Sequence, residues 1–125
     1  MLVFGTRNGL YAVDLSNTSY VRRFKAENVV SLDFGLDPNV VYWTGRNGIN
    51  RFSLHNGVSE DLPFRLDADS SVEGLVVSWL DHTLFWTDAK HDAVYLGDLR
   101  NGRKVKLVDD KLDSPRAIVL SHSEG

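Results

Sequence analysis

The sequence contains no cysteine, which excludes both a disulfide framework and a thiolate metal site. No apolar run approaches the roughly 20 residues that a membrane helix needs, so direct membrane insertion is not expected. A basic surplus is also missing, since 14 Lys and Arg stand against 17 Asp and Glu. The resulting net charge of -3 argues against a nucleic-acid partner. The N-terminal stretch MLVFGTRNG has neither a basic head nor a long apolar segment and is not expected to be a signal peptide.

The chain is long enough for one ordinary domain, and its composition is that of a globular protein. It has 125 residues, of which 42% are hydrophobic and 25% charged. Within it, RNGLYAVDL at 7–15 aligns with RNGINRFSL at 46–54, and VVYWTG at 40–45 resembles TLFWTD at 83–88. Both spacings are about 40 residues, a period typical of propellers, solenoids or arrays.

Short runs rich in β-branched and aromatic residues fill each repeat, separated by turn residues, and no stretch keeps a helical period. The expected strands fall in units of four, after an incomplete first unit and before a lone final run: Leu2–Thr6, Gly9–Leu15, Tyr20–Lys25, Val29–Phe34, Val40–Thr44, Ile49–Leu54, Glu60–Leu66, Gly74–Trp79, Thr83–Thr87, Ala93–Leu99, Lys104–Val108 and Arg116–Leu120.

Polarity changes in a fixed order within each unit. The first two strands, such as GLVVSWL and TLFWT, are apolar on both faces, whereas the fourth, YVRRFK or RKVKLV, is largely polar. A strand that is apolar on both faces is buried on both. We therefore expect an all-β fold of radial, four-stranded antiparallel blades, since a β-sandwich would show one wet face in most strands.

The segments VVYWTG and TLFWTD, followed by GINRFSLHNG and AVYLGDLRNG and then DSPRAIVL, resemble the YWTD repeats (class B repeats) of the low-density lipoprotein receptor family, also found in nidogen and Wnt co-receptors. The resemblance implies a six-bladed β-propeller, of which this chain corresponds to the first half, about three of six blades. The repeats would run approximately over 2–39, 40–82 and 83–125, with Val3–Thr6 as a degenerate first motif. It also implies an extracellular parent or receptor ectodomain, whose remaining blades and flanking cysteine-rich modules would be partners.

The motif residues are interpreted as architecture. The large apolar ones belong between blades, and Asp88 ends a strand where a carboxylate can accept backbone N–H bonds. Gly45 and Thr6 take the place of Asp88 in the other repeats, so something else must hold those turns. The structural motif comprises Tyr42, Trp43, Thr44, Phe85, Trp86, Thr87 and Asp88.

Neither catalysis nor a cofactor is indicated. Ser121-His122-Ser123 reads as loop, and the four histidines are spaced too irregularly for zinc. The acidic stretch LVDDKLDS lacks the glycine and the final glutamate of a calcium loop. We therefore expect no catalytic residue, no metal and no cofactor. Asn17-Thr18-Ser19 is an N-glycosylation acceptor in a predicted turn, which makes Asn17 a candidate glycosylation site.

A propeller places successive loops on opposite faces of its disc. One face, named the crossover face here, collects the turns between second and third strands and the connections between blades. The opposite face collects the other turns, including that of Asn17. A glycan there leaves the crossover face free, and loops on a rigid scaffold concentrate function. The candidate ligand-binding residues are Arg46, Asn47, Glu73, Lys90, His91 and Arg116.

The leading functional hypothesis is a non-catalytic, extracellular protein-binding or scaffold module of a lipoprotein-receptor-like, Wnt-co-receptor-like or nidogen-like protein, with a protein ligand on the crossover face. One alternative is an intramolecular partner that acts at acidic pH through His91 or His82. Another is a calcium-dependent hydrolase-type six-bladed propeller with Asn28 and Glu73 at the axis. The bare outer faces of a half propeller are expected to make the chain aggregate or pair.

Overall fold

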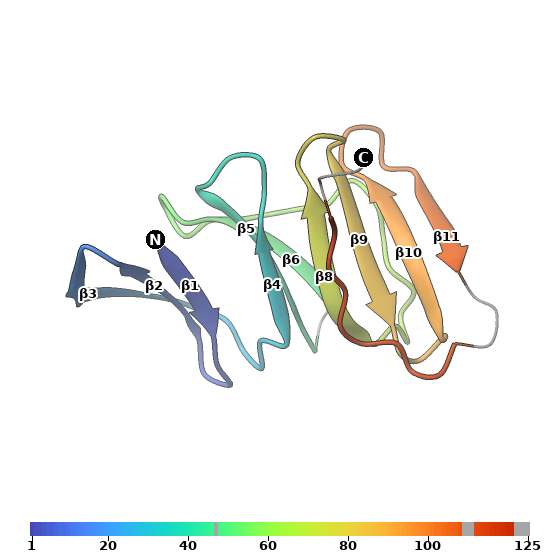
Figure 1. Cartoon of the computed structure of the whole chain (residues 1–125), viewed down its shortest axis with the longest axis horizontal. Coiled ribbons are helices and arrows are strands. Elements are labelled where there is room, and N and C mark those ends of the chain that lie inside the picture. Colours follow the sequence, from blue (N-terminus) through green and yellow to red (C-terminus); the bar gives the residue numbers. More distant parts are fainter. Residues whose placement is uncertain (47, 109–111, 122–125) are drawn as a thin grey trace.

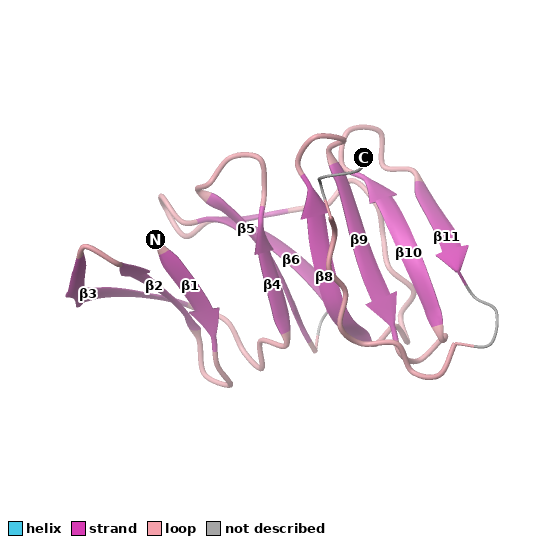
Figure 2. Ribbon diagram, viewed as in Figure 1, coloured by secondary structure: helices cyan, strands magenta, loops and turns pink. Residues whose placement is uncertain are grey.

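Three antiparallel sheets stand side by side in the computed structural model, which describes residues 1–46, 48–108 and 112–121 (Figures 1 and 2). No helix occurs in these ranges. We call the sheets blades 1, 2 and 3. Blade 1 comprises β1 (Leu2–Gly5), β2 (Leu10–Asp14) and β3 (Asn17–Phe24). Blade 2 comprises β4 (Ser31–Phe34), β5 (Val40–Gly45), β6 (Gly48–Ser53) and β7 (Ser59–Glu60), and blade 3 comprises β8 (Val72–Ser78), β9 (Thr83–Asp88), β10 (Ala93–Asp98) and β11 (Lys104–Val108).

The strands of each blade follow one another in sequence order, joined by hairpins. In blade 3 the two inner strands are buried as predicted, with β9 buried at five of its six positions, and only the last residue of the outer strand β3 is buried. The innermost strand of blade 2, β4, is half-buried along its whole length. The fold is thus all-β and matches part of a β-propeller, as expected from the sequence.

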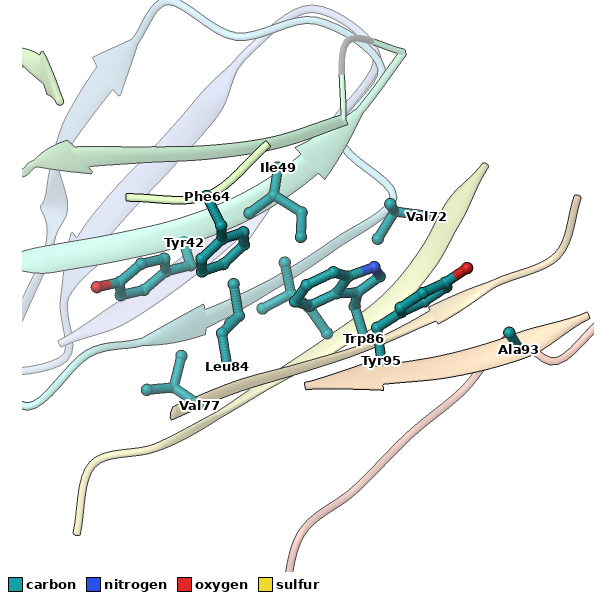
Figure 3. Packing of buried hydrophobic residues seen from close by; sticks show 10 residues of the cluster. Tyr42, Ile49, Phe64, Val72, Val77, Leu84, Trp86, Ala93 and Tyr95 are labelled. Carbon is teal, nitrogen blue, oxygen red and sulfur yellow. The ribbon is translucent and has the colours of Figure 1, made fainter. Parts of the chain in front are cut away.

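Two hydrophobic clusters form the core, and both lie between blades. The cluster between blades 2 and 3 contains Trp86, which is 1% exposed. Its indole stacks on Phe64 on one side and on Tyr95 of β10 on the other, with ring centroids 5.3 Å and 5.6 Å away (Figure 3). Gly97 makes room for this insertion, because a Cβ there would lie 2.4 Å from the Phe64 ring. Phe64 reaches the cluster from the connection between the blades.

Trp43 occupies the equivalent position in blade 2. It pairs with Asn50 across the sheet, as Trp86 pairs with Tyr95, and packs half-buried against the cluster between blades 1 and 2. Both tryptophans therefore face the preceding blade. The corresponding side of blade 1 carries Phe4 stacked on Tyr11 with centroids 5.4 Å apart, and Phe4 is 41% exposed.

The innermost strands of blades 2 and 3 are joined through side chains. Asp33 Oδ2 accepts a hydrogen bond from the Val77 N–H at 2.8 Å, and Ser31 Oγ accepts one from the Leu75 N–H at 3.3 Å. These bonds hold β8 against β4 in the absence of a backbone ladder, which makes the two blades one packed unit.

Three strand predictions were wrong. The run 20–25 belongs to a longer strand, β3, so Asn17-Thr18-Ser19 starts this strand and does not form the predicted turn. The run 60–66 yields only β7, because Pro63 lacks an N–H for the ladder and Phe64 turns into the core. The run 116–120 lies beside β8 but is not a strand. The Arg116 carbonyl accepts a hydrogen bond from the Thr87 hydroxyl at 2.6 Å, where a strand would accept one from a neighbouring backbone N–H.

Candidate binding face

The crossover face lies along the lower edge in Figure 1. It carries the turns β1–β2, β5–β6 and β9–β10, the connection 25–30 and the end of the connection 61–71. The start of the latter connection lies nearer the opposite face, where Pro63 is close to Gly102 of the β10–β11 turn. The turns β4–β5, β8–β9 and β10–β11 lie on the opposite face. The placement of the loops on two faces follows the arrangement expected from the repeat.

The best-defined polar feature of this face is the turn after β9. The side chain of Asp88 is fully buried, and its Oδ1 accepts hydrogen bonds from the backbone N–H groups of Ser71, Lys90 and His91 at 3.0–3.2 Å. Its Oδ2 lies 2.7 Å from Nδ1 of His91. One carboxylate therefore fixes both its own turn and the connection that enters β8.

His91 is held between two carboxylates. While Nδ1 contacts Asp88, Nε2 lies 3.2 Å from Oδ1 of Asp69, which is well exposed. The hydrogen bond to Asp88 is the largest cause that raises the pKa of His91; burial opposes it, and the charges of Asp88, Asp69 and Asp67 add to the rise. This histidine holds its proton at higher pH than a free imidazole does.

Burial opposes the ionisation of Asp88, yet the net pKa of Asp88 is lowered. Hydrogen bonds from the His91 ring and from the backbone of Ser71 and His91 outweigh the cost of burial. The pair therefore exists as carboxylate and imidazolium over a wider pH range than the free groups would.

The turns of the other two blades lack this carboxylate. In blade 1, Thr6 Oγ1 accepts a hydrogen bond from the Asn8 N–H at 3.1 Å and so takes over part of the role of the carboxylate. In blade 2, the turn closes through the pair Gly45 and Gly48, of which Gly48 has a φ of +86° that favours glycine.

The remaining candidate residues are spread along the face. Arg46 and Lys90 are exposed in the turns β5–β6 and β9–β10. Glu73 lies half-buried in β8 and accepts a hydrogen bond from the Ser71 hydroxyl at 3.2 Å. Arg116 is exposed beside β8, and Asn47 lies outside the described residues. The structure brings Lys90, His91 and Glu73 to the junction of blades 2 and 3, whereas Arg46 lies near blade 1.

The motif residues occupy strands β5 and β9. Tyr42, Trp86, Thr44 and Thr87 are buried, and Phe85 is half-buried on the outer side of blade 3. Thr87 Oγ1 bridges the Gly74 N–H and the Arg116 carbonyl. None of the seven presents a reactive group to a solvent-filled cavity.

Three shallow hollows lie on the crossover face. The hollow at blade 2 has a volume of about 740 Å³ and runs between β6 and the segment 61–70. Two others, of about 720 and 440 Å³, lie between blades 1 and 2 and share Glu27, Asn28 and Arg46. The face is therefore open and subdivided, with no deep enclosed pocket among these three.

Two residues that the sequence analysis passed over belong to this face. Arg23 was interpreted as part of a solvated outer strand, but it lines the hollow between blades 1 and 2. Asp69 contacts His91 from the connection 61–71, a segment in which the sequence shows no motif. Nothing local predicts either: only the pairing of β3 with β2 sets Arg23 opposite Tyr11, and only the path of the connection brings Asp69 to His91.

No group of three or more His, Cys, Asp or Glu that could hold a metal ion occurs in the part of the chain that the structure describes. Asn28 and Glu73, the residues considered for a calcium site, lie in different elements: the Asn28 N–H donates to the Arg7 carbonyl in the connection 25–30, and Glu73 in β8 accepts the Ser71 hydroxyl. The described residues also include no helix that is long and apolar enough to cross a membrane. Asn17 is exposed at the start of β3, where its Oδ1 accepts the Ser19 hydroxyl at 2.7 Å.

Comparison with known proteins finds two receptor-related proteins to which the chain is similar. No protein-family model matches it. It is 25% identical over 130 residues to low-density lipoprotein receptor-related protein 5 of Mus musculus, covering 100% of this chain and 8% of the relative. It is 28% identical over 108 residues to low-density lipoprotein receptor-related protein 8 of Homo sapiens, covering 82% of this chain and 11% of that protein. The chain thus spans about a tenth of these relatives.

Two solved structures resemble it in fold. A propeller in the crystal structure of the nidogen/laminin complex superposes with a TM-score of 0.74 at 25% identity, over 91% of this chain and 46% of that one. The structure of apo AztD from Citrobacter koseri gives a TM-score of 0.65 at 14% identity, over 88% and 31% of the two chains, which shows a shared fold alone. These findings confirm the resemblance to YWTD-repeat propellers and the partial propeller fold.

Proposed function

We propose that the chain is a non-catalytic protein-binding module of an extracellular or receptor-ectodomain protein and that its ligand binds the crossover face. The main support is its likeness to the nidogen propeller, a protein found in complex with laminin. The relatives are receptor-related proteins, which fits the same class. The remaining blades and cysteine-rich modules of a parent chain complete this proposal as intramolecular partners.

The arrangement of side chains favours binding over reaction. Asp88, which is hydrogen-bonded to His91, holds the backbone of its turn, since it already accepts three N–H groups. A catalytic carboxylate needs a free lone pair that faces substrate. The exposed side chains around this pair, among them Lys90, remain available for a ligand.

The contact residues that we propose are those expected from the sequence: Arg46, Asn47, Glu73, Lys90, His91 and Arg116. The described ones run from the β5–β6 turn of blade 2 to blade 3, the scale on which a protein ligand makes its contacts. Glycosylation at Asn17 would be compatible, because Asn17 starts β3 beside the turn β2–β3, away from this face.

A random-peptide display library panned against the purified chain tests the proposal, because displayed peptides select surfaces suited to protein ligands. Hydrogen exchange with and without an enriched peptide then maps the contact. We expect protection in the turns 46–48 and 89–92, with the turns 36–39 and 99–103 of the opposite face as internal controls. Protection confined to the opposite face, or failure of any peptide to enrich, would overturn the proposal.

A further inference from the structure

Three arginines surround the larger hollow between blades 1 and 2 on the crossover face. Arg7 comes from the turn β1–β2, Arg23 from β3 and Arg46 from the turn β5–β6. The adjoining smaller hollow adds Lys25 and one edge of Trp43. We call these five residues the arginine hollow.

These arginines have no ion-pair partner within residues 1–46, 48–108 and 112–121, whereas two cations elsewhere, Arg51 and Lys104, have one. Arg51 lies 3.7 Å from Glu60, and Lys104 lies 3.7 Å from Asp67. Glu27 is the one acidic side chain that lines the hollow. In a chain of net charge -3, such a local surplus of positive charge attracts anions.

The hollow is built by backbone contacts rather than by chance proximity of flexible side chains. Arg23 Nη2 donates a hydrogen bond to the Asn8 carbonyl at 2.7 Å, and Gly9 leaves space for its guanidinium. The Asn28 N–H donates to the Arg7 carbonyl at 2.9 Å, which ties the turn β1–β2 to the connection between the blades. The backbone of Arg7 and the guanidinium group of Arg23 are therefore fixed relative to each other.

Trp43 supplies a rigid apolar wall. Its indole packs on the cluster between blades 1 and 2, so it cannot swing away, but it is only half-buried. Gly45 allows the close approach of Trp43 and the Glu27 carbonyl, since a Cβ at residue 45 would lie 2.7 Å from the ring. An apolar surface thus borders the cationic one.

We propose that the arginine hollow binds an acidic peptide segment of a protein ligand, with carboxylates on the guanidinium groups and an apolar side chain on Trp43. This deepens the proposed function and rests on it. Guanidinium forks bind carboxylates with two parallel hydrogen bonds, and an aromatic beside them adds the apolar contact that peptides provide.

A short peptide fits better than a sulfated polysaccharide. A long polyanion needs free cations in a continuous stripe, but at the next junction His91 and Lys104 are already paired with Asp69 and Asp67. The continuation of such a chain would have to compete with these carboxylates. The cationic part of the face is therefore the size of a few residues.

The test uses the intact chain and a fluorescein-labelled octapeptide of glutamates with one central leucine, followed by fluorescence anisotropy. The same peptide with glutamine in place of glutamate controls for charge, and a heparin hexasaccharide serves as the alternative polyanion. We expect the acidic peptide to bind and its affinity to fall by roughly tenfold in Arg46→Glu, because a charge on the edge of an interface is reversed. Arg103→Glu, the same change in the turn β10–β11 of the opposite face, should leave binding unaltered.

Equal binding of the glutamine peptide, equal loss in both variants, or a preference for heparin would each overturn this inference. The proposed function is judged separately by the enriched library peptides. If these protect the crossover face but are not acidic, the protein-binding function holds and the acidic-ligand inference fails. Matching thermal melts of Arg46→Glu and the unmodified chain exclude unfolding as the cause of a loss.

Discussion

The ring of Phe64 lies on the indole of Trp86, with centroids 5.3 Å apart and planes 9° from parallel. Phe64 belongs to the connection between blades 2 and 3, and Trp86 to the second strand of blade 3. The contact therefore closes the space between two sheets that share no backbone ladder. Together with the hydrogen bonds between β4 and β8, this packing of a side chain from the connection joins the two blades into one unit.

Removing the Phe64 ring should be costly. Phe64→Ala is expected to lower the free energy of unfolding by about 3–5 kcal/mol, because it leaves a cavity against a fully buried indole. The matched control is Phe4→Ala, which deletes a ring stacked on Tyr11 in the same way but on the exposed side of blade 1. That variant should lose about 0.5–1.5 kcal/mol. Urea unfolding followed by circular dichroism measures both, and equal losses would contradict the packing described.

Gly97→Ala should destabilise the chain for the opposite reason. The new methyl group would collide with the Phe64 ring and overpack the core, at a cost of about 1–3 kcal/mol. In the Phe64→Ala background the same methyl enters vacated space, so its cost should vanish. A double-mutant cycle by urea unfolding measures this coupling. Additive losses would show that the two residues do not meet.

Asp88→Asn should loosen the turn after β9. An amide oxygen accepts fewer and weaker bonds than the carboxylate, so the N–H groups of Ser71, Lys90 and His91 lose part of their partner. We expect a loss of about 1–3 kcal/mol and faster amide exchange at these three positions. Unchanged exchange by NMR would mean that the carboxylate does not hold the turn.

The pair of His91 and Asp88 predicts a pH window of extra stability. The raised pKa of His91 contributes stability fully below its unfolded value of about 6.5, and this contribution is lost as the pH rises through the folded pKa. The lowered pKa of Asp88 contributes above about 3.9 and is lost as the pH falls through its folded value. Both contributions are present between these limits.

The melting temperature of His91→Gln relative to the unmodified chain tests this window. The deficit of the variant should be largest near pH 5 and should shrink as the pH rises past the folded pKa of His91, measured by NMR titration. A titration midpoint of His91 below the ordinary histidine value, or a deficit that is constant from pH 5 to 9, would contradict the geometry.

Much of the fold follows from local pattern. The nearly continuous apolar runs in VVYWTG and TLFWTD predict strands that are buried on both faces. Strands β5 and β9 begin where expected. The period near 40 residues identifies the repeat, and Asp88 before a turn predicts a carboxylate that accepts backbone bonds. These features depend on neighbours in sequence, which is why the sequence reveals them.

What the sequence could not predict depends on connections between blades. The segment 61–71 has no periodic pattern, yet it delivers Phe64 to Trp86 and Asp69 to His91. Arg23 has the pattern of a solvated strand residue, and only the pairing of β3 with β2 places it beside Asn8. The arginine hollow likewise combines three separate elements, and no single stretch of sequence contains it.

A glycan placed on one face or the other tests the central claim most directly. In an Asn17→Gln background expressed in mammalian cells, Val30→Thr makes Asn28 an acceptor beside the arginine hollow, and Arg103→Thr makes Asn101 an acceptor on the opposite face. The affinity of the enriched library peptides is then measured for each glycosylated chain. We predict that a glycan at Asn28 abolishes binding whereas one at Asn101 leaves it intact. Retained binding with Asn28 glycosylated, or its loss with Asn101 glycosylated, would contradict the assignment of the crossover face as the ligand surface.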